Sequence, residues 1–132
     1  MTPVLLHQRG SRTCGQTCVA MVVGASEIEV CDVIDHLAGT GTKHLQAALT
    51  HYGVSFEKRL RPATKKDPMC ARFQRAILAC KMTYGKGHPD NWHWMLRWDG
   101  EIYDPGGWWP NCAAGSRITS ALVLTGRPGL AW

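Results

Sequence analysis

The spacing of apolar residues changes once along this chain, near residue 53. Between residues 13 and 53 the apolar positions recur every three or four residues, which is the period of an amphipathic helix. Between residues 54 and 125 they alternate with polar residues or form short apolar runs bounded by Gly, Pro and Asp. Helices followed by strands predict an α+β fold, in which N-terminal helices pack on a C-terminal antiparallel sheet.

Three helices are predicted, over residues 14–23, 27–37 and 42–52. Ser11 or Thr13 can cap the first, and Gly24 can end it. Ser26 is the expected cap of the second, and Gly53 ends the third. The expected buried stripes are Ile28, Cys31, Ile34, Leu37 and Ala38 on the second helix, and Leu45, Ala48, Leu49 and Tyr52 on the third.

Strands are predicted over residues 54–60, 75–84, 92–98, 101–106 and 118–126. Asp99 and Gly100 separate two of them, and this dipeptide favours a two-residue hairpin turn. The segment 61–74 carries no clear pattern and is expected to be a loop or a short helix.

The chain has 132 residues, 45% of them hydrophobic and 19% charged, which predicts a single globular domain over 1–132. No apolar run approaches bilayer-spanning length, and no signal peptide is recognisable at the start, so a cytoplasmic protein is expected. In that compartment the six cysteines should be reduced thiols, and their spacing fits zinc sites poorly. No metal or cofactor is expected.

The formal net charge is +5, and the densest cationic stretch is KRLRPATKK, residues 58–66, here called the basic segment. The favoured interpretation is a solvated loop, and the alternative is a contact surface for an acidic partner. No nucleic-acid-binding motif accompanies the charge, so neither a nucleic acid nor a membrane is an expected partner.

Cys14 is the better of two candidate nucleophiles near the start of the first helix. There the helix dipole and unpaired N–H groups favour a thiolate, whereas Cys18 lies one turn further in, among packed neighbours. Gly15 leaves room for a substrate backbone. Gln8, six residues upstream of Cys14, can direct its amide toward the Cys14 N–H and so complete an oxyanion hole. The alternative is that both cysteines are simply core thiols.

The hairpin supplies a candidate base and a group to orient it. With a two-residue turn, Met95 pairs with Asp104 and His93 pairs with Gly106. His93 and Asp104 are then diagonal neighbours on one face, roughly 7–8 Å apart at the backbone. Asp104 can therefore hold the ring of His93 with its other nitrogen directed at Cys14. The alternative is a hairpin with a surface histidine and aspartate.

All six tryptophans lie between residues 92 and 132. Trp94 and Trp98 are expected to face away from His93, into the core or a second layer. Trp108 and the tryptophan that follows it either form a wall of the cleft around Cys14 and His93 or only pack against other core residues, and the sequence favours neither interpretation. Trp92 and Trp108 are candidate substrate-binding residues together with Gly15.

Gln8 with CGQTCVAM (14–21), TKHLQAALTHYGV (42–54) and HWMLRWDGEIYDP (93–105) resemble segments of papain-like cysteine peptidases, in particular the double-glycine leader peptidases and their relatives. The resemblance implies a papain-like fold. It also implies a nucleophile at Cys14, an oxyanion glutamine at Gln8, and a histidine–aspartate pair at His93 and Asp104. The transporter domains that usually accompany such peptidases have no counterpart here.

These observations favour a cysteine hydrolase that cleaves a peptide or isopeptide bond, processing or deconjugating a protein tail. Its partner would be a protein or peptide substrate. One alternative is a papain-fold binding or inhibitor protein with weak or no turnover. A third hypothesis is an acyl transferase that uses the same cysteine.

Overall fold

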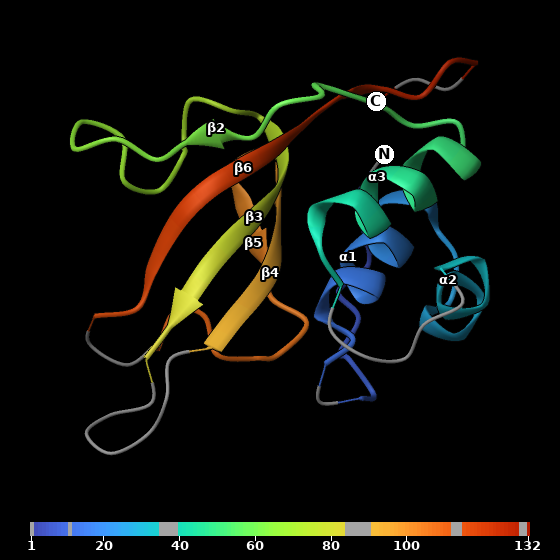
Figure 1. Cartoon of the computed structure of the whole chain (residues 1–132), viewed down its shortest axis with the longest axis horizontal. Helices are drawn as coiled ribbons and strands as arrows, with labels where there is room; N and C mark the ends of the chain where they lie inside the picture. Colours follow the sequence, from blue (N-terminus) through green and yellow to red (C-terminus); the bar gives the residue numbers. More distant parts are fainter. Residues whose placement is uncertain (1, 11, 35–39, 84–90, 112–114, 130–131) are drawn as a thin grey trace.

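The computed structural model describes residues 2–10, 12–34, 40–83, 91–111, 115–129 and 132. Helices come first along the chain, strands follow, and all strand pairs are antiparallel, as the α+β prediction requires. Figure 1 shows the helices gathered on one side of the sheet. The helices are α1 (Cys14–Val23), α2 (Glu27–Ile34) and α3 (Thr42–His51); the strands are β1 (Ser55–Phe56), β2 (Arg61–Pro62), β3 (Arg75–Met82), β4 (Asn91–Trp98), β5 (Glu101–Tyr103) and β6 (Arg117–Gly126).

Helix α1 lies between the sheet and the other two helices, which is why nearly all of its residues are apolar or small. Its residues from Cys14 to Val22 are all buried. It ends at Gly24, whose left-handed φ of 73° suits glycine, and the Gly24 N–H donates to the Ala20 carbonyl. The predicted bounds of this helix are confirmed.

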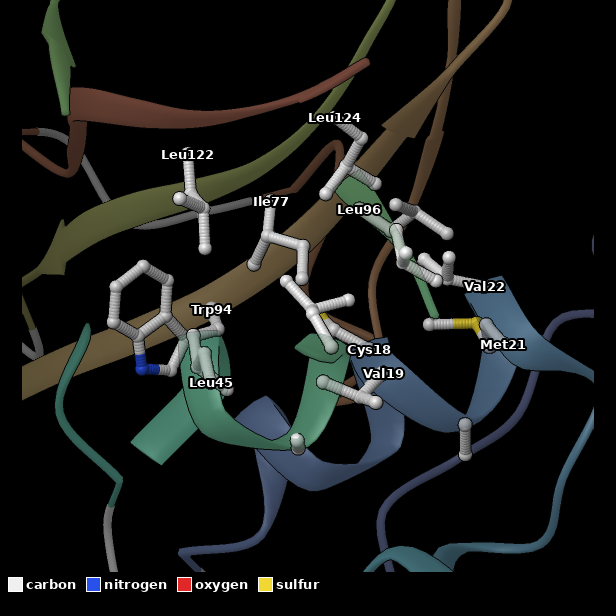
Figure 2. Packing of buried hydrophobic residues seen from close by; sticks show 14 of the residues in the cluster. Cys18, Val19, Met21, Val22, Leu45, Ile77, Trp94, Leu96, Leu122 and Leu124 are labelled. Carbon is white, nitrogen blue, oxygen red and sulfur yellow. The ribbon is translucent and has the colours of Figure 1, made fainter. Parts of the chain in front are cut away.

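The main core fills the space between α1 and the sheet. Figure 2 shows Cys18, Val19 and Val22 of α1 directed toward Ile77 and Leu96 of the sheet. Alternate residues of the strands face the other way and form a second cluster, which includes Leu78, Cys80, Met82 and Met95; Cys70 and Phe73, from the segment before β3, complete it. The sheet therefore carries one apolar cluster on each face, and the helices cover only the first.

The sheet order is β1-β6-β3-β4-β5, and β2 also pairs with β6. The β4–β5 hairpin has the predicted register, with Leu96 opposite Tyr103 and Trp98 opposite Glu101. Its turn residues Asp99 and Gly100 have φ values of 49° and 88°, as a type I′ turn requires. Trp94 and Trp98 join the core beneath the helices, on the face opposite Met95, as the alternation predicts; Met95 belongs to the second cluster, which was not predicted.

Two strand predictions need correction, because the pairing partner lies far away in sequence. The predicted strand over 54–60 is paired only at Ser55–Phe56, where the register against β6 shifts by a bulge. The segment 61–74, predicted to be a loop or short helix, contains β2, which pairs with β6 through Arg61–Ala121 and Pro62–Ser120. The remainder of that segment consists of turns.

The predicted second helix was right in its start and partly right in its buried face. Ser26 accepts a hydrogen bond from the Glu29 N–H at 3.1 Å, as expected of the cap. Cys31 is buried and Ile34 is partly buried against the core, as predicted, whereas the predicted Ile28 is 56% exposed and Val30 is buried in its place. Helix α2 ends at Ile34, and the predicted stripe residues Leu37 and Ala38 lie outside the described residues. The face shifts because α2 packs against both α1 and α3, and helical periodicity alone does not say which stripe meets two neighbours.

The other elements differ from prediction only at their ends. Helix α3 ends at His51, followed by Tyr52 and by Gly53 with a φ of 73°, and it buries Leu45, Ala48 and Leu49 as expected. Strand β3 ends at Met82 rather than residue 84, and β5 ends at Tyr103 rather than residue 106. The early end of β5 matters for the site described next.

Candidate active site

Cys14 is the first residue of α1, and its side chain faces β4. It is 8% exposed, so a little of its surface still meets solvent. Thr13 occupies the N-cap position but does not cap the helix with its side chain. Its hydroxyl instead bonds the Gly10 N–H at 3.1 Å and the Gly10 carbonyl at 3.2 Å. The first N–H groups of α1 are therefore not occupied by this side chain, and they support negative charge at Cys14. Ser11, the other predicted cap, lies outside the described residues.

The sulfur of Cys14 accepts a hydrogen bond from the Trp94 backbone N–H at 3.4 Å. This contact joins the start of α1 to the outer edge of β4, and a donor at that position stabilises a thiolate. Cys18, one turn further along, is fully buried in the core. Burial, with a smaller effect from Cys14, raises the pKa of the Cys18 thiol well above its ordinary value. The prediction that Cys18 is the packed cysteine is confirmed.

His93 and Asp104 are in direct contact, as the hairpin geometry predicted. The Nε2 atom of His93 lies 2.5 Å from Oδ1 of Asp104, and the two side chains are 10% and 3% exposed. Because Nε2 is held by the carboxylate, Nδ1 is the nitrogen left for Cys14. Burial, the largest influence, favours a neutral ring. The hydrogen bond to Asp104 and the nearby Cys14 side chain outweigh burial and raise the pKa of His93 from 6.5 to about 9.

The Asp104 carboxylate is held by more donors than His93 alone. Oδ1 accepts the Gly106 N–H, and Oδ2 accepts the N–H groups of Trp108 and Trp109, each at 2.8 Å. Burial alone would raise the pKa of Asp104, but the hydrogen bond from His93 and the backbone N–H groups hold it below 3.8. Sequence reasoning missed this set of donors. The run Asp104-Pro-Gly-Gly, which indicates a tight turn after a strand, was the available signal.

Trp108 lies beside the pair rather than far from it. A side-chain carbon built on Gly106 would come within 2.8 Å of the Trp108 ring and 2.9 Å of Cε1 of His93. Both rings therefore approach the bare Cα of Gly106, and only glycine leaves them room. Trp108 is 38% exposed, so it contacts both this loop and solvent.

Gln8 is tied to the same loop through its backbone. Its N–H donates to the Pro105 carbonyl at 2.9 Å, next to Asp104. Its side-chain Nε2 donates to the Gly10 carbonyl at 2.8 Å, in the turn that leads into α1. The side-chain oxygen is buried without a hydrogen-bond partner among the described residues. Gln8 thus lies between the aspartate loop and the nucleophile helix, with one of its two amide hydrogens already bonded.

Close packing around α1 accounts for the glycine at position 15. A side-chain carbon on Gly15 would meet Thr40 Oγ1 at 2.2 Å and Leu45 Cδ2 at 2.9 Å. The glycine therefore lets α1 approach α3 and the segment before it. Its predicted contact with substrate stays a prediction.

A cleft of about 380 Å³ begins beside His93, between the helices and the sheet. Trp92, predicted to bind substrate, is 63% exposed and forms part of its wall. The other wall residues were not predicted, because they come from five separate segments of the chain. They are Thr40, Gly41 and Thr42 before and within α3, Leu60, Ala79 of β3, Trp94 of β4, and Thr119 and Ser120 of β6.

In the part of the chain that the structure describes, no three His, Cys, Asp or Glu side chains converge on a possible metal position. The five described cysteines, Cys14, Cys18, Cys31, Cys70 and Cys80, are free thiols. None of the described helices combines the length and apolar character that crossing a membrane would need. No protein-family model matches the chain, and no curated protein matches it in sequence.

Proposed function

We propose that this chain is a papain-like cysteine hydrolase that cleaves a peptide or isopeptide bond. The observation that carries the proposal is the series formed by Asp104, by His93 hydrogen-bonded to it, and by Cys14, which is close enough to the ring to raise the pKa of His93. The helical layer contributes the sulfur and the sheet contributes the imidazole and carboxylate, which is consistent with the fold that the sequence resemblance implies. Such a series activates a thiol and supplies an acid for the leaving group.

Each group has a defined task in the proposed reaction. The Cys14 thiolate attacks the carbonyl carbon, so that a carbon–sulfur bond forms. Protonated His93 gives its proton to the departing amine as the carbon–nitrogen bond breaks, and an acyl-enzyme remains. Water then attacks the thioester while His93 takes its proton, which releases the acid and restores the thiol–imidazole pair. Asp104 keeps the ring oriented and stabilises its positive charge.

The negative oxygen of the tetrahedral intermediate needs donors at the start of α1. The Cys14 N–H is one, because the side chain of Thr13 does not cap the helix. The second amide hydrogen of Gln8 is the other, since its first is bonded to Gly10. Each such donor typically contributes about 3–4 kcal/mol to transition-state binding.

Selective alkylation tests this proposal. Iodoacetamide at neutral pH should modify Cys14 well before the other cysteines, as measured by mass spectrometry of the digested protein. A Cys14→Ala variant used as bait should then retain a protein that the wild type cleaves and releases. A retained partner that binds both proteins equally, and that the wild type leaves intact, would contradict hydrolysis.

The alternative is a binding or inhibitor protein that keeps this fold with little turnover. The exposed ring of Trp92 at the edge of the cleft is the observation that favours it, because exposed tryptophans are common at docking surfaces. Slow and uniform alkylation of all cysteines would support this alternative. An acyl transferase would instead form product only when an amine acceptor is added.

A further inference from the structure

The cleft beside His93 has one wall residue in the basic segment, residues 58–66. His93 and Trp94 line the cleft next to Cys14, and Leu60, which directly follows Lys58 and Arg59, lines it as well. An extended peptide bound in the cleft would therefore lie near both Cys14 and the cations that flank Leu60.

The cations of the basic segment exceed the acidic groups around them. Glu57 is bonded to Arg61 at 2.9 Å, and Asp67 is bonded to Arg72 at 2.8 Å. The remaining cations are exposed and have no acidic partner among the described residues; they are Lys58, Arg59, Lys65 and Lys66. These four positive charges can therefore contact an acidic ligand.

The basic segment is fixed to the rest of the molecule at its start and in its middle. Gln46 of α3 donates to the Lys58 carbonyl at 3.0 Å, at the start of the segment. Further on, Pro62 pairs with Ser120 of β6, and its carbonyl accepts a bond from Arg72 at 2.6 Å. The Arg72 guanidinium also stacks 4.2 Å from the centre of the Phe73 ring. Because the backbone is held in this way, the cations keep their position relative to the cleft.

The walls of the cleft are otherwise uncharged. Apart from His93, its lining consists of hydroxyl, glycine and apolar side chains, with no carboxylate. The cleft itself therefore suits neutral residues next to the scissile bond, and charge is recognised at the cations that flank Leu60. Phe73 is the aromatic residue that accompanies these cations, and it is buried, whereas the exposed Trp92 ring lies in the cleft wall with His93.

We infer that the substrate is a peptide that carries a cluster of acidic side chains a few residues from the bond to be cleaved, and that Lys58 and Arg59 contact this cluster. The inference rests on the proposed function, because it uses Cys14 as the reacting group. Charge attraction of this kind raises association rates by about 10- to 1,000-fold at low salt.

Electrophilic peptides of opposite charge test the inference without knowledge of the natural substrate. One pair consists of neutral Ala-Ala-Gly vinyl sulfones preceded by Glu-Glu-Glu or by Lys-Lys-Lys. A second pair carries an N-terminal chloroacetyl group before Gly-Ala-Ala, followed by the same charged triplets. The measurement is the second-order rate of Cys14 alkylation, followed by intact mass spectrometry, with iodoacetamide as the uncharged reference.

In at least one of the two pairs, which place the charged triplet before or after the reactive group, the Glu probe should react about tenfold faster than the Lys probe at low salt. About 0.5 M NaCl should remove this difference in rate. The Lys58→Glu, Arg59→Glu double variant should lose or invert the preference while its iodoacetamide rate stays unchanged. The matched control, Arg59→Lys, keeps the charge and should keep the preference. A misfolded variant would lose the iodoacetamide rate as well, so charge and folding effects are separable.

Three results would overturn the inference, and they point to different errors. Fast iodoacetamide labelling of Cys14 with equal Glu and Lys rates would refute the acidic substrate and leave the proposed hydrolase intact. The same equality, together with tight binding of a single-stranded oligonucleotide that the double variant loses, would identify the basic segment as a nucleic-acid surface. Failure of every reagent to label Cys14 selectively would refute the proposed function itself, and the inference with it.

Discussion

Replacing Asp104 by asparagine should uncouple His93 from Cys14 while leaving the fold in place. The carboxylate accepts four hydrogen bonds, from His93 and from three backbone N–H groups. An asparagine has one oxygen, so its amide nitrogen must face at least two of these donors. The ring of His93 then loses both its negative neighbour and the group that fixes which nitrogen points to Cys14.

The size of the effect follows from the pKa of His93. Its rise from 6.5 to about 9 is equivalent to roughly 3 kcal/mol at 1.36 kcal/mol per pKa unit. The ring is only 10% exposed, so solvent screens the interaction little. Burial, the largest influence, favours the neutral ring, and the Asp104 hydrogen bond is the largest influence against it. Without the carboxylate we expect the pKa of His93 to fall to 6.5 or below, so that the ratio of protonated to neutral ring at pH 7 falls about 300-fold, from about 100:1 to about 0.3:1.

The assay is the pH dependence of Cys14 alkylation by iodoacetamide, combined with an NMR titration of the His93 ring nitrogens. The matched control is Asp99→Asn, the same chemical change in the same hairpin, at a residue that bonds Arg75 at the surface. The control should follow the wild type in both measurements. A wild-type alkylation rate at pH 6–7 in Asp104→Asn, with His93 still titrating near 9, would refute the assigned role of the carboxylate.

Three further predictions follow from the same contacts. Because the pKa of His93 is raised in the folded protein, the protonated ring stabilises the fold fully below pH 6.5, and this stabilisation is lost as the pH rises through about 9. Between these pH values the free energy of unfolding, measured by urea titration, should fall by about 3 kcal/mol more in the wild type than in His93→Gln. Gly106→Ala brings a carbon within 2.9 Å of the His93 ring and should slow alkylation of the nucleophile, whereas Gly41→Ala, which meets nothing within 4 Å at a φ of −89°, should not. Gly15→Ala places a carbon 2.9 Å from Leu45 and should cost about 1–3 kcal/mol in thermal or urea unfolding; a fully stable variant would contradict the packing role of this glycine.

The parts of the fold that local rules govern could be predicted from the sequence. The Asp99-Gly100 turn sets the register of the three hairpin pairs that form, and it brings Asp104 close to His93. The predicted pairs Met95–Asp104 and His93–Gly106 do not form, because β5 ends at Tyr103 and Asp104 reaches His93 from the loop that follows. The bounds of α1 follow from the apolar run and from Gly24, which stops it. Each of these inferences uses residues close together in sequence, where few competing partners exist.

The errors concern contacts between distant segments. The pairing of Pro62 with Ser120 joins a segment without a strand pattern to the last strand, and nothing near Pro62 indicates that partner. Ile28 and Val30 are both apolar residues of α2, and only the positions of α1 and α3 decide that Val30 is buried. The three backbone donors to Asp104 depend on the path of a loop, which side-chain patterns do not describe.

The early end of β5 is what allows the proposed site to assemble. Strand β4 pairs with β3 along all eight of its residues, but β5 covers only its last three, from Leu96 to Trp98. The Trp94 N–H on the uncovered edge therefore bonds the Cys14 sulfur rather than another strand. Had the hairpin continued to residue 106, as the alternating pattern predicts, Pro105 would lie opposite Trp94 and occupy the position of α1.

The chain turns away after β5 instead, and one turn brings three functional groups together. Asp104 leaves the ladder, and its carboxylate reaches His93 and the loop N–H groups. The carbonyl of Pro105, released from strand pairing, accepts the Gln8 N–H and holds the segment before α1. The unpaired edge of a strand normally invites association with another chain, so such edges are usually covered. Here the cover is the start of the nucleophile helix, and the interruption that stops β5 at Tyr103 therefore determines how close Cys14 comes to His93.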